Sequence, residues 1–487
     1  MSHFFTHIAI CFLSLVFFLS CSKERNEATE SFSYASDFFT RSDFSLSKAD
    51  LLKIPKEKMI TREIIPLIIE RNLDKSEFKN IDKYDLTTVS KDDRELMHVA
   101  NFDGGGWAII SGCFKEGDLI LAQSTEGQFD PENIESPEVR FWFEKALSMV
   151  EGEINSDDEK VSEITLRSVP QGDYLWIRIP TEDVVTSSLY YQVSPLTNTQ
   201  WGQRSPWNSY CPIPPGTSTR CPFGCTAVAY AQMLYYLHRE LGVPDGLYHQ
   251  IDTSYTWNST GEYYTSNITK SDYNNPSPRW TTMQKYPSSN VTQYSLYTGN
   301  FILDIADRLG TKFSASGSEA DFLTDIFDSL GVNCTLSNTI CDNTIITNSL
   351  DESMPVLVSA YDSGQSVGTR SSTDNGGHAW IIDGYKITQH TTDHQSYLRR
   401  IPSDSLMFFN YLIIDQIYTD SRKESLFPDV GEYEIIHDYS YSYTTKFRMN
   451  WGWNGLHNGY YSSDPLYWNP NSNLFNDRIK MIYGFSL

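Results

Sequence analysis

The stretch from Cys221 to Leu237 constrains the fold most, because it sets a cysteine on a glycine turn directly before a run of good helix formers. After Cys225, small and apolar residues recur every three or four positions, and Gly242 and Pro244 follow as stop signals. We therefore predict a helix that begins near Cys225. A thiol at a helix N-terminus faces unpaired backbone N–H groups and the positive end of the helix dipole, which favour the thiolate.

This setting makes Cys225 a candidate nucleophile, but the helix alone does not activate it. The dipole contributes about 0.3–1 kcal/mol, whereas one pKa unit corresponds to about 1.4 kcal/mol. Full activation therefore needs a cationic partner, and a histidine is the expected one. The alternative is that Cys225 is a small buried apolar residue, which is the more common role of a cysteine outside a disulfide.

The histidine in the best setting is His378, which follows a glycine turn and opens a short apolar stretch. There an imidazole can take the Cys225 proton, form a thiolate–imidazolium pair and later protonate the leaving amine. Strand alternation puts His378, Trp380 and Ile382 on one face and Asp383 on the other. Asp383 is therefore a poor candidate to orient the imidazole ring.

Three further side chains are candidates for the same site. Asn450 ends an expected strand, so its amide oxygen can accept the Nδ1–H of His378, and the Trp451 indole can cover that bond from water. Gln203 lies in a loop before Cys225 and can donate to an oxyanion together with the Cys225 backbone N–H. Taken singly, a loop glutamine and a strand end with core tryptophans have ordinary structural explanations. Their occurrence together with the cysteine and the histidine favours catalysis.

Charge and spacing argue against other classes of function. The 487 residues are enough for two or three domains, and the formal net charge of −24 comes without a basic run that would bind nucleic acid. His390 and His394 have a metal-like spacing but lack the glutamate of a zinc protease helix, so we interpret them as part of a solvated loop. The gaps between Cys211, Cys221 and Cys225 fit no usual zinc spacing. We expect neither a metal nor a cofactor.

Residues 1–20 contain an apolar block that is typical of a signal peptide. The block ends at Leu19-Ser20-Cys21 and gives way at once to a polar tether over 21–45, which resembles a bacterial lipoprotein signal whose cysteine is lipidated. We therefore expect the chain in the bacterial cell envelope, lipid-anchored at Cys21, or secreted. No later segment is long and apolar enough to span a bilayer, so a lipid on Cys21 would be the membrane contact.

Such a compartment is oxidising, so disulfides are expected among the cysteines. Cys211 and Cys221 are candidates for one bridge, and Cys334 and Cys341 for another. A loop of about that size would contribute on the order of 3 kcal/mol. Both bridges would leave Cys225 unpaired, as a reactive thiol requires, although the sequence does not fix the connectivity.

Residues 46–185 indicate a compact α+β unit. Short strands are expected at 107–110, after three glycines, and at 119–122, and a helix is expected to begin at Ser136 and Pro137. A further strand is expected at 174–179. No catalytic arrangement is evident here, so this region alone indicates a small binding or stabilising domain.

Four blocks together resemble the streptopain family of papain-like cysteine proteases. They are Trp201-Gly202-Gln203, Gly224-Cys225 with the helix formers after it, Gly377-His378-Ala379-Trp380, and Asn450-Trp451-Gly452-Trp453. Residues 101–111 are similar to that family's propeptide. The resemblance implies an α+β fold in which a papain-like catalytic domain, residues 186–487, follows an inhibitory prodomain, residues 46–185, that proteolysis removes.

The resemblance also implies roles for single residues: Cys225 as nucleophile, His378 as base and acid, Gln203 as oxyanion donor, Asn450 as partner of the histidine and Trp451 as its shield. Expected partners are protein or peptide substrates and the chain's own prodomain. An insertion over about 387–443 is expected between two core strands, as a surface lid or binding loop. Two alternatives stay open, a cell-wall peptide amidase and a catalytically silent binding lipoprotein on the same fold.

Overall fold

The structure is a computed structural model, and it describes the chain over the greater part of its length. The described residues are 60, 62, 65–91, 94–113, 119–156, 174–243, 250–257, 264–271, 280–315, 317–337, 342–360, 378–402, 416–419, 433–464 and 479–487. The predicted signal peptide, the lipidation candidate Cys21, the polar tether and Cys341 lie outside them. Within the described residues, no helix has the length and hydropathy that crossing a membrane requires.

The chain divides into two compact units, of which the smaller contains Met1–Glu57, Leu166–Val184 and Asp393–Asp438. In this unit, β11 (Gln416–Thr419) pairs antiparallel with β5 (Tyr174–Val193), with Ile417 opposite Ile177. The strand predicted at 174–179 is therefore confirmed. The remaining described residues belong to the larger unit, which contains both the candidate site and most of the region before it.

The first part of the larger unit is mixed α and β, as predicted. Its elements are α2 (Ile65–Asn72), β1 (Tyr84–Lys91), β2 (Arg94–Phe102), β3 (Trp107–Ser111), β4 (Ile120–Ser124) and α3 (Pro137–Ser156). The glycines at 104, 105 and 106 join β2 to β3 with φ values of 94°, 100° and 98°, a backbone region in which side chains are strained. Both predicted strands and the predicted helix start are thus confirmed.

The four strands of this first part continue into the sheet formed by the rest of the unit. β4 pairs antiparallel with β13 (Gly459–Ser462), where Tyr460 lies opposite Gln123 and Tyr461 opposite Ala122. The sheet order is β1-β2-β3-β4-β13-β12-β10-β9-β14-β8, and β5 also pairs with β10. The two regions that the sequence separates at residue 185 therefore share one sheet.

The second part supplies the other strands of this sheet and the helices beside it. Its strands are β6 (Gln250–Trp257), β7 (Tyr264–Ser271), β8 (Asn333–Ser337), β9 (Val356–Ala360), β10 (His378–Pro402), β12 (Tyr433–Asn450) and β14 (Lys480–Ser486). Its helices are α4 (Cys225–Leu241), the short 3-10 helix η3 (Trp280–Thr282), α5 (Gln293–Arg308), α6 (Asp325–Asp328) and α7 (Asn343–Asp351). β6 and β7 form a separate two-stranded sheet.

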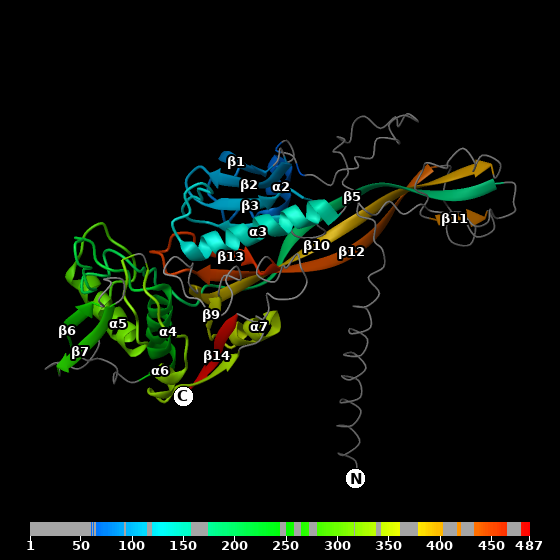
Figure 1. Cartoon of the computed structure of the whole chain (residues 1–487). Helices are drawn as coiled ribbons and strands as arrows, with labels where there is room; N and C mark the ends of the chain where they lie inside the picture. Colours follow the sequence, from blue (N-terminus) through cyan, green and yellow to red (C-terminus); the bar gives the residue numbers. More distant parts are fainter. Residues whose placement is uncertain are drawn as a thin grey trace, which may run out of the picture. The chain divides into compact units, whose positions relative to one another are not determined.

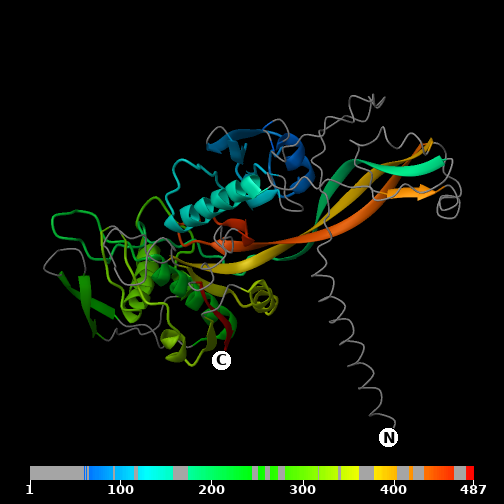
Figure 2. The ribbon, with the colours of Figure 1, turned by 45° about the vertical axis from the view of Figure 1, so that its right-hand side comes forward.

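Helices α3 and α4 cover opposite faces of the main sheet. Strand alternation sends Leu357 and Ile381 into a buried cluster with α4, while Val358 and Trp380 enter a second cluster with α3. Figures 1 and 2 show α3 lying over β12 and β13 in both views. The central strands are therefore buried on both sides, which fixes the position of residues at their ends.

The structure adds to or corrects several sequence-based expectations about this region. β10 and β12 run as strands into the range 387–443, where an insertion between two core strands was expected, and its role as a lid or binding loop stays a prediction. His390 was interpreted as part of a solvated loop, but it lies within β10 and is buried. The candidate bridge between Cys211 and Cys221 is also absent, since both side chains are buried free thiols.

Candidate active site

Cys225 is the first residue of α4, as predicted; the residue as a whole is partly exposed, but its thiol group is surrounded by protein atoms. The preceding Gly224 has φ 88°, and a Cβ there would lie 2.4 Å from the carbonyl oxygen of Ser318. This position therefore requires glycine. The helix ends at Gly242, which is left-handed (φ 66°) and donates its N–H to the carbonyl of His238. The thiol thus lies at the N-terminus of a complete helix.

Gln203 lies beside the start of this helix. Its carbonyl oxygen accepts the backbone N–H of Phe223 at 2.9 Å, which fixes the loop two residues before Cys225. The Gln203 side chain is 7% exposed, and its Nε2 donates to Oε1 of Glu138 at 3.4 Å. The predicted oxyanion donor is therefore held close to the predicted nucleophile.

His378 begins β10 and lies opposite Ala360 of β9. Its side chain is buried, and its Nδ1 lies 3.9 Å from Oε1 of Glu138. The imidazole ring also packs against Phe141, with ring centroids 5.7 Å apart. Both contacts come from α3, so the histidine faces the region before residue 185.

Glu138 is the functional residue that sequence reasoning missed. It lies in the first turn of α3 and is 1% exposed, and its Oε2 accepts a hydrogen bond from Ser136 at 2.8 Å. The same carboxylate contacts Gln203, His378 and the thiol of Cys225. An acidic residue in a first helical turn is a common capping feature, so the sequence held no signal that it reaches a site in another part of the chain.

This carboxylate and its surroundings keep the thiol protonated. Burial of the thiol raises the pKa of Cys225 to about 12, and the negative charge of Glu138 and its hydrogen bond from the thiol contribute to the rise. Backbone N–H groups of Ala379 and Thr226 act in the opposite direction but do not offset it. At neutral pH the described site therefore holds a thiol and not the thiolate that attack on a carbonyl requires.

Asn450 is not where the sequence placed it relative to His378. Its Nδ2 donates to the carbonyl of Thr199 at 2.9 Å, to Oε1 of Gln232 at 3.2 Å and to Oγ1 of Thr197 at 3.3 Å. Within the part of the chain that is described, no hydrogen bond joins it to His378. Asn450 instead ties the end of β12 to α4 and to the segment that precedes it.

Trp451 also differs from its predicted role, because its indole packs beside β10 and not against the imidazole of His378. Its indole packs against Trp380 and Tyr461, with ring centroids 5.2 Å away in each case. Asp383 points away from the site, as predicted, because its carboxylate pairs with Arg448 at 2.7 and 2.9 Å. The structure therefore brings together Cys225, Gln203 and the ring of His378 around one carboxylate.

A second contact joins the first part of the larger unit to the second part, eight residues beyond His378 along β10 and so away from Glu138. Lys386 of β10 donates to both oxygens of Glu77 at 2.6 Å, and the lysine side chain is 10% exposed. A bidentate ion pair that is mostly withdrawn from water is stronger than a surface pair. The ion pair therefore helps to bind residues 65–156 to the strands of the second part.

The neighbouring contact is a chain of neutral hydrogen bonds. Ser187 Oγ lies 2.7 Å from Oδ1 of Asn72 and 2.8 Å from Nδ1 of His390, whose Nε2 lies 2.7 Å from Oγ1 of Thr444. Burial, with a smaller contribution from the Lys446 ammonium, lowers the pKa of His390 to about 4. The ring is therefore neutral at physiological pH and can donate at one nitrogen and accept at the other.

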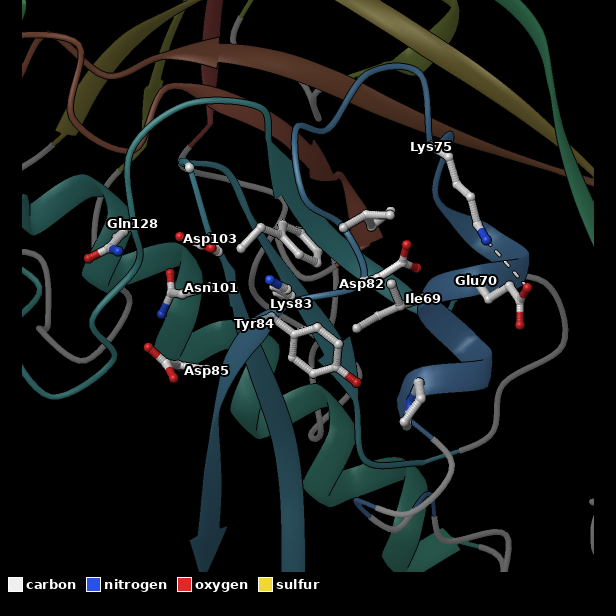
Figure 3. A pocket seen from close by; sticks show the side chains of 14 residues that line it. Ile69, Glu70, Lys75, Asp82, Lys83, Tyr84, Asp85, Asn101, Asp103 and Gln128 are labelled. Carbon is white, nitrogen blue, oxygen red and sulfur yellow. Dashed lines mark hydrogen bonds and ion pairs between the residues drawn. The ribbon is translucent and has the colours of Figure 1, made fainter.

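A cavity of about 870 Å³ lies in the first part and is lined by charged residues that include Glu70, Asp82, Asp85 and Asp103 (Figure 3). Glu70 pairs with Lys75 at 3.4 Å on its rim. None of the residues predicted for catalysis lines it, so this cavity is not the candidate site. The described residues contain no group of three or more His, Cys, Asp or Glu that could hold a metal ion.

The fold and the site define a class of protein. A cysteine at the N-terminus of a buried helix, with a histidine at the start of a strand in the sheet beside it, is the papain-like arrangement of a cysteine peptidase. Residues 201–398 match the model of the Peptidase C10 family. The matched range contains Gln203, Cys225 and His378, so over this range the chain is similar to the C10 (streptopain) family of cysteine proteases.

Two solved structures from Prevotella intermedia are similar to this chain. A fragment of prointerpain A with a cysteine-to-alanine mutation is 18% identical, covers 82% of this chain and 99% of its own, and has a TM-score of 0.46. The active wild-type interpain A cysteine protease is 21% identical, covers 61% of this chain and 97% of its own, and has a TM-score of 0.36. No curated protein matches this chain.

Proposed function

We propose that this chain is the zymogen of a cysteine endopeptidase that hydrolyses peptide bonds in proteins. The observation that carries the proposal is the position of Glu138, whose carboxylate contacts Cys225, His378 and Gln203 at once. A side chain in this place occupies the space that a scissile carbonyl needs, and it keeps the thiol protonated. Residues before about 185 would thus act as an inhibitor that is part of the same chain.

Once this inhibitor leaves, the residues can act as an acid–base pair and a nucleophile. His378 takes the Cys225 proton, and the thiolate attacks the scissile carbonyl carbon, whose oxygen becomes an anion held by Gln203 Nε2 and the Cys225 backbone N–H. The imidazolium gives its proton to the leaving amine, which leaves a thioester. Water that loses a proton to His378 then hydrolyses the thioester and releases the carboxylate product and the thiol.

Asn450 and Trp451 act as positioning residues in this proposal. The Asn450 amide holds the segment before α4 through Thr199 and the helix itself through Gln232, so it supports the place of Cys225. Trp451 packs on Trp380, which follows His378 by two residues in β10. Each supports a reacting residue without touching it.

The broad attachment of the first part to the second supports the inhibitor proposal. The shared sheet at β4 and β13, the ion pair between Glu77 and Lys386, and the bond between Asn72 and Ser187 all lie apart from Glu138. Cutting the chain between the parts would therefore leave them bound by several contacts. Release of activity then requires the first part to dissociate or be degraded.

The test is self-processing of residues 22–487 under mild reductant, followed by intact mass. We expect the chain to lose a segment that ends between about Val169 and Val193, and we expect the Cys225→Ala chain to stay whole, because only the thiolate can form the thioester. As a control, an added protease shows whether residues 169–193 are accessible to cleavage in the parent chain and in the Cys225→Ala chain. If neither chain cuts itself and the protease-released domain hydrolyses no peptide, the chain is a binding lipoprotein.

We further propose that the chain is exported and lipid-anchored at Cys21. The support is the apolar block before Cys21 and the polar residues that follow it. When the full chain is expressed in a bacterium, it should enter the membrane fraction and incorporate labelled fatty acid, and Cys21→Ser should do neither. Recovery of the Cys21→Ser chain in the membrane fraction with unchanged label would show that another signal holds it there.

A further inference from the structure

A row of exposed tyrosines lies on two strands of the main sheet, β5 and β12. Tyr439, Tyr441 and Tyr443 alternate along β12 and are 58%, 60% and 53% exposed, and Tyr190 of β5 is 62% exposed. β10 pairs with both of these strands and lies between them. We name the four residues the tyrosine face. Large aromatic side chains gathered at this exposure usually mark a binding surface.

Two of the four rings are held in place by contacts within the face. Tyr190 and Tyr443 pack edge to face across the middle strand, with ring centroids 5.2 Å apart. Gln389 of β10 donates its amide to the Tyr443 hydroxyl at 3.2 Å. Two rings and one amide are thus held in place before any ligand arrives, which lowers the entropy cost of binding.

The tyrosine face points away from the residues that dock the first part of the chain. His390 and Thr444 contact each other on the side of Ser187 and Asn72. Gln389 and Tyr443 are their direct neighbours in sequence, and successive strand residues point to opposite faces. The first part therefore does not cover the tyrosine face, and the three tyrosines of β12 stay with the catalytic part after the first part has been removed.

The chemistry around the rings selects the kind of ligand. Segments 187–193, 387–392 and 439–445 contain no Asp, Glu, Lys or Arg, in a chain of which 21% is charged. Their other residues are mainly Ser, Thr and Gln. Arg and Met, which are enriched in protein interfaces together with aromatic residues, are absent from these segments. The charged groups next to this stretch on the same side, Asp393 of β10 and His437 of β12, already pair with each other at 2.8 Å. A charged ligand would therefore find no unpaired counter-charge among these segments, and a protein partner would find little apolar surface besides the rings.

We propose that the tyrosine face binds a neutral oligosaccharide chain. The electron-rich ring faces attract the C–H groups of a sugar, while tyrosine hydroxyls and the Gln389 amide can hydrogen-bond its hydroxyls. Successive tyrosines on one side of a strand are about 7 Å apart, so the row suits an extended chain and not a single small molecule. Such a site would keep the peptidase on glycosylated protein or on a polysaccharide surface.

The test uses the Cys225→Ala form of residues 22–487, which cannot cut itself, in gels that contain neutral polysaccharides (mannan, β-glucan or galactan) and on an array of neutral glycans. We expect at least one of these to bind, and we expect Tyr439→Ala/Tyr441→Ala/Tyr443→Ala to weaken that binding about tenfold or more. The matched control is Tyr286→Ala/Tyr294→Ala, since these tyrosines are 55% and 56% exposed but lie elsewhere. The control should bind as the parent does.

The triple Tyr→Phe variant keeps the rings and should retain most of the binding, which also guards against a fault in folding. Binding to none of the neutral glycans, or equal loss in the control, would overturn the proposal. So would a parent chain that sediments as a dimer and becomes monomeric in the triple alanine variant, because the face would then be a protein interface. None of these three results depends on whether Cys225 is catalytic.

Discussion

Removal of the first part of the chain is expected to raise the rate of alkylation of Cys225 by iodoacetamide about a hundredfold at pH 7. The pKa of about 12 in the closed chain leaves almost no thiolate. A return to the usual value of about 8.5 raises the thiolate fraction by roughly three orders of magnitude. A less basic thiolate is also a weaker nucleophile, with a Brønsted slope of about 0.4–0.5, which cancels about half of that gain on a logarithmic scale.

The measurement is the rate of mass increase at Cys225 against pH, before and after an added protease has released the first part. The midpoint should move to lower pH on release. The raised pKa also makes binding of the first part depend on pH. Below the ordinary thiol pKa, Cys225 is protonated whether the first part is bound or dissociated, so its titration does not weaken binding. As pH rises above that value, only the dissociated form loses the proton, so binding of the first part becomes weaker. An unchanged midpoint would show that Glu138 and the surrounding burial do not control the thiol.

Glu138→Gln separates the two causes of the raised pKa in the intact chain. The amide keeps the size of the side chain but removes its charge, so the pKa of Cys225 should fall part of the way while burial keeps the rest. Alkylation and self-processing should both become faster than in the parent. Glu144→Gln is the matched control, since Glu144 lies on the same helix with its side chain exposed, and it should behave as the parent does.

The local parts of this site could be predicted because local rules determine them. The start of α4 follows from a glycine with positive φ and the helix formers after it, and its end follows from Gly242. Strand alternation gave the correct sides for Trp380 and Asp383. These features depend on neighbours within a few positions, which a sequence shows directly.

The parts that could not be predicted depend on contacts between distant segments. Asn450 has the right residue type to hold a histidine, but Thr199 and Gln232 take its amide, and nothing near Asn450 in the sequence shows this competition. Glu138 could not be recognised because its partner Gln203 is 65 residues away. His390 was misplaced because polar neighbours suggested a loop, whereas pairing with other strands buried it.

Gln203→Ala is expected to lower kcat of the released enzyme by about a hundredfold to a thousandfold, with little change in KM. The reason is that the Gln203 amide would meet the carbonyl oxygen most strongly once that oxygen is an anion. In the closed chain the same Nε2 already donates to a carboxylate oxygen of Glu138, which shows that it can hold a negative oxygen next to Cys225. Loss of one such donor costs about 2.7–4 kcal/mol in the transition state.

The measurement is steady-state hydrolysis of a fluorogenic peptide after an added protease has removed the first part, since this variant is too slow to process itself. Gln293→Ala is the control, because Gln293 is an exposed glutamine of α5 that stays in the released enzyme, and it should leave both constants unchanged. A rise in KM with kcat unchanged would instead make Gln203 a substrate-binding residue. In that case the Cys225 backbone N–H would have to hold the oxyanion without the side chain, and the contact with Glu138 would reflect inhibitor binding alone.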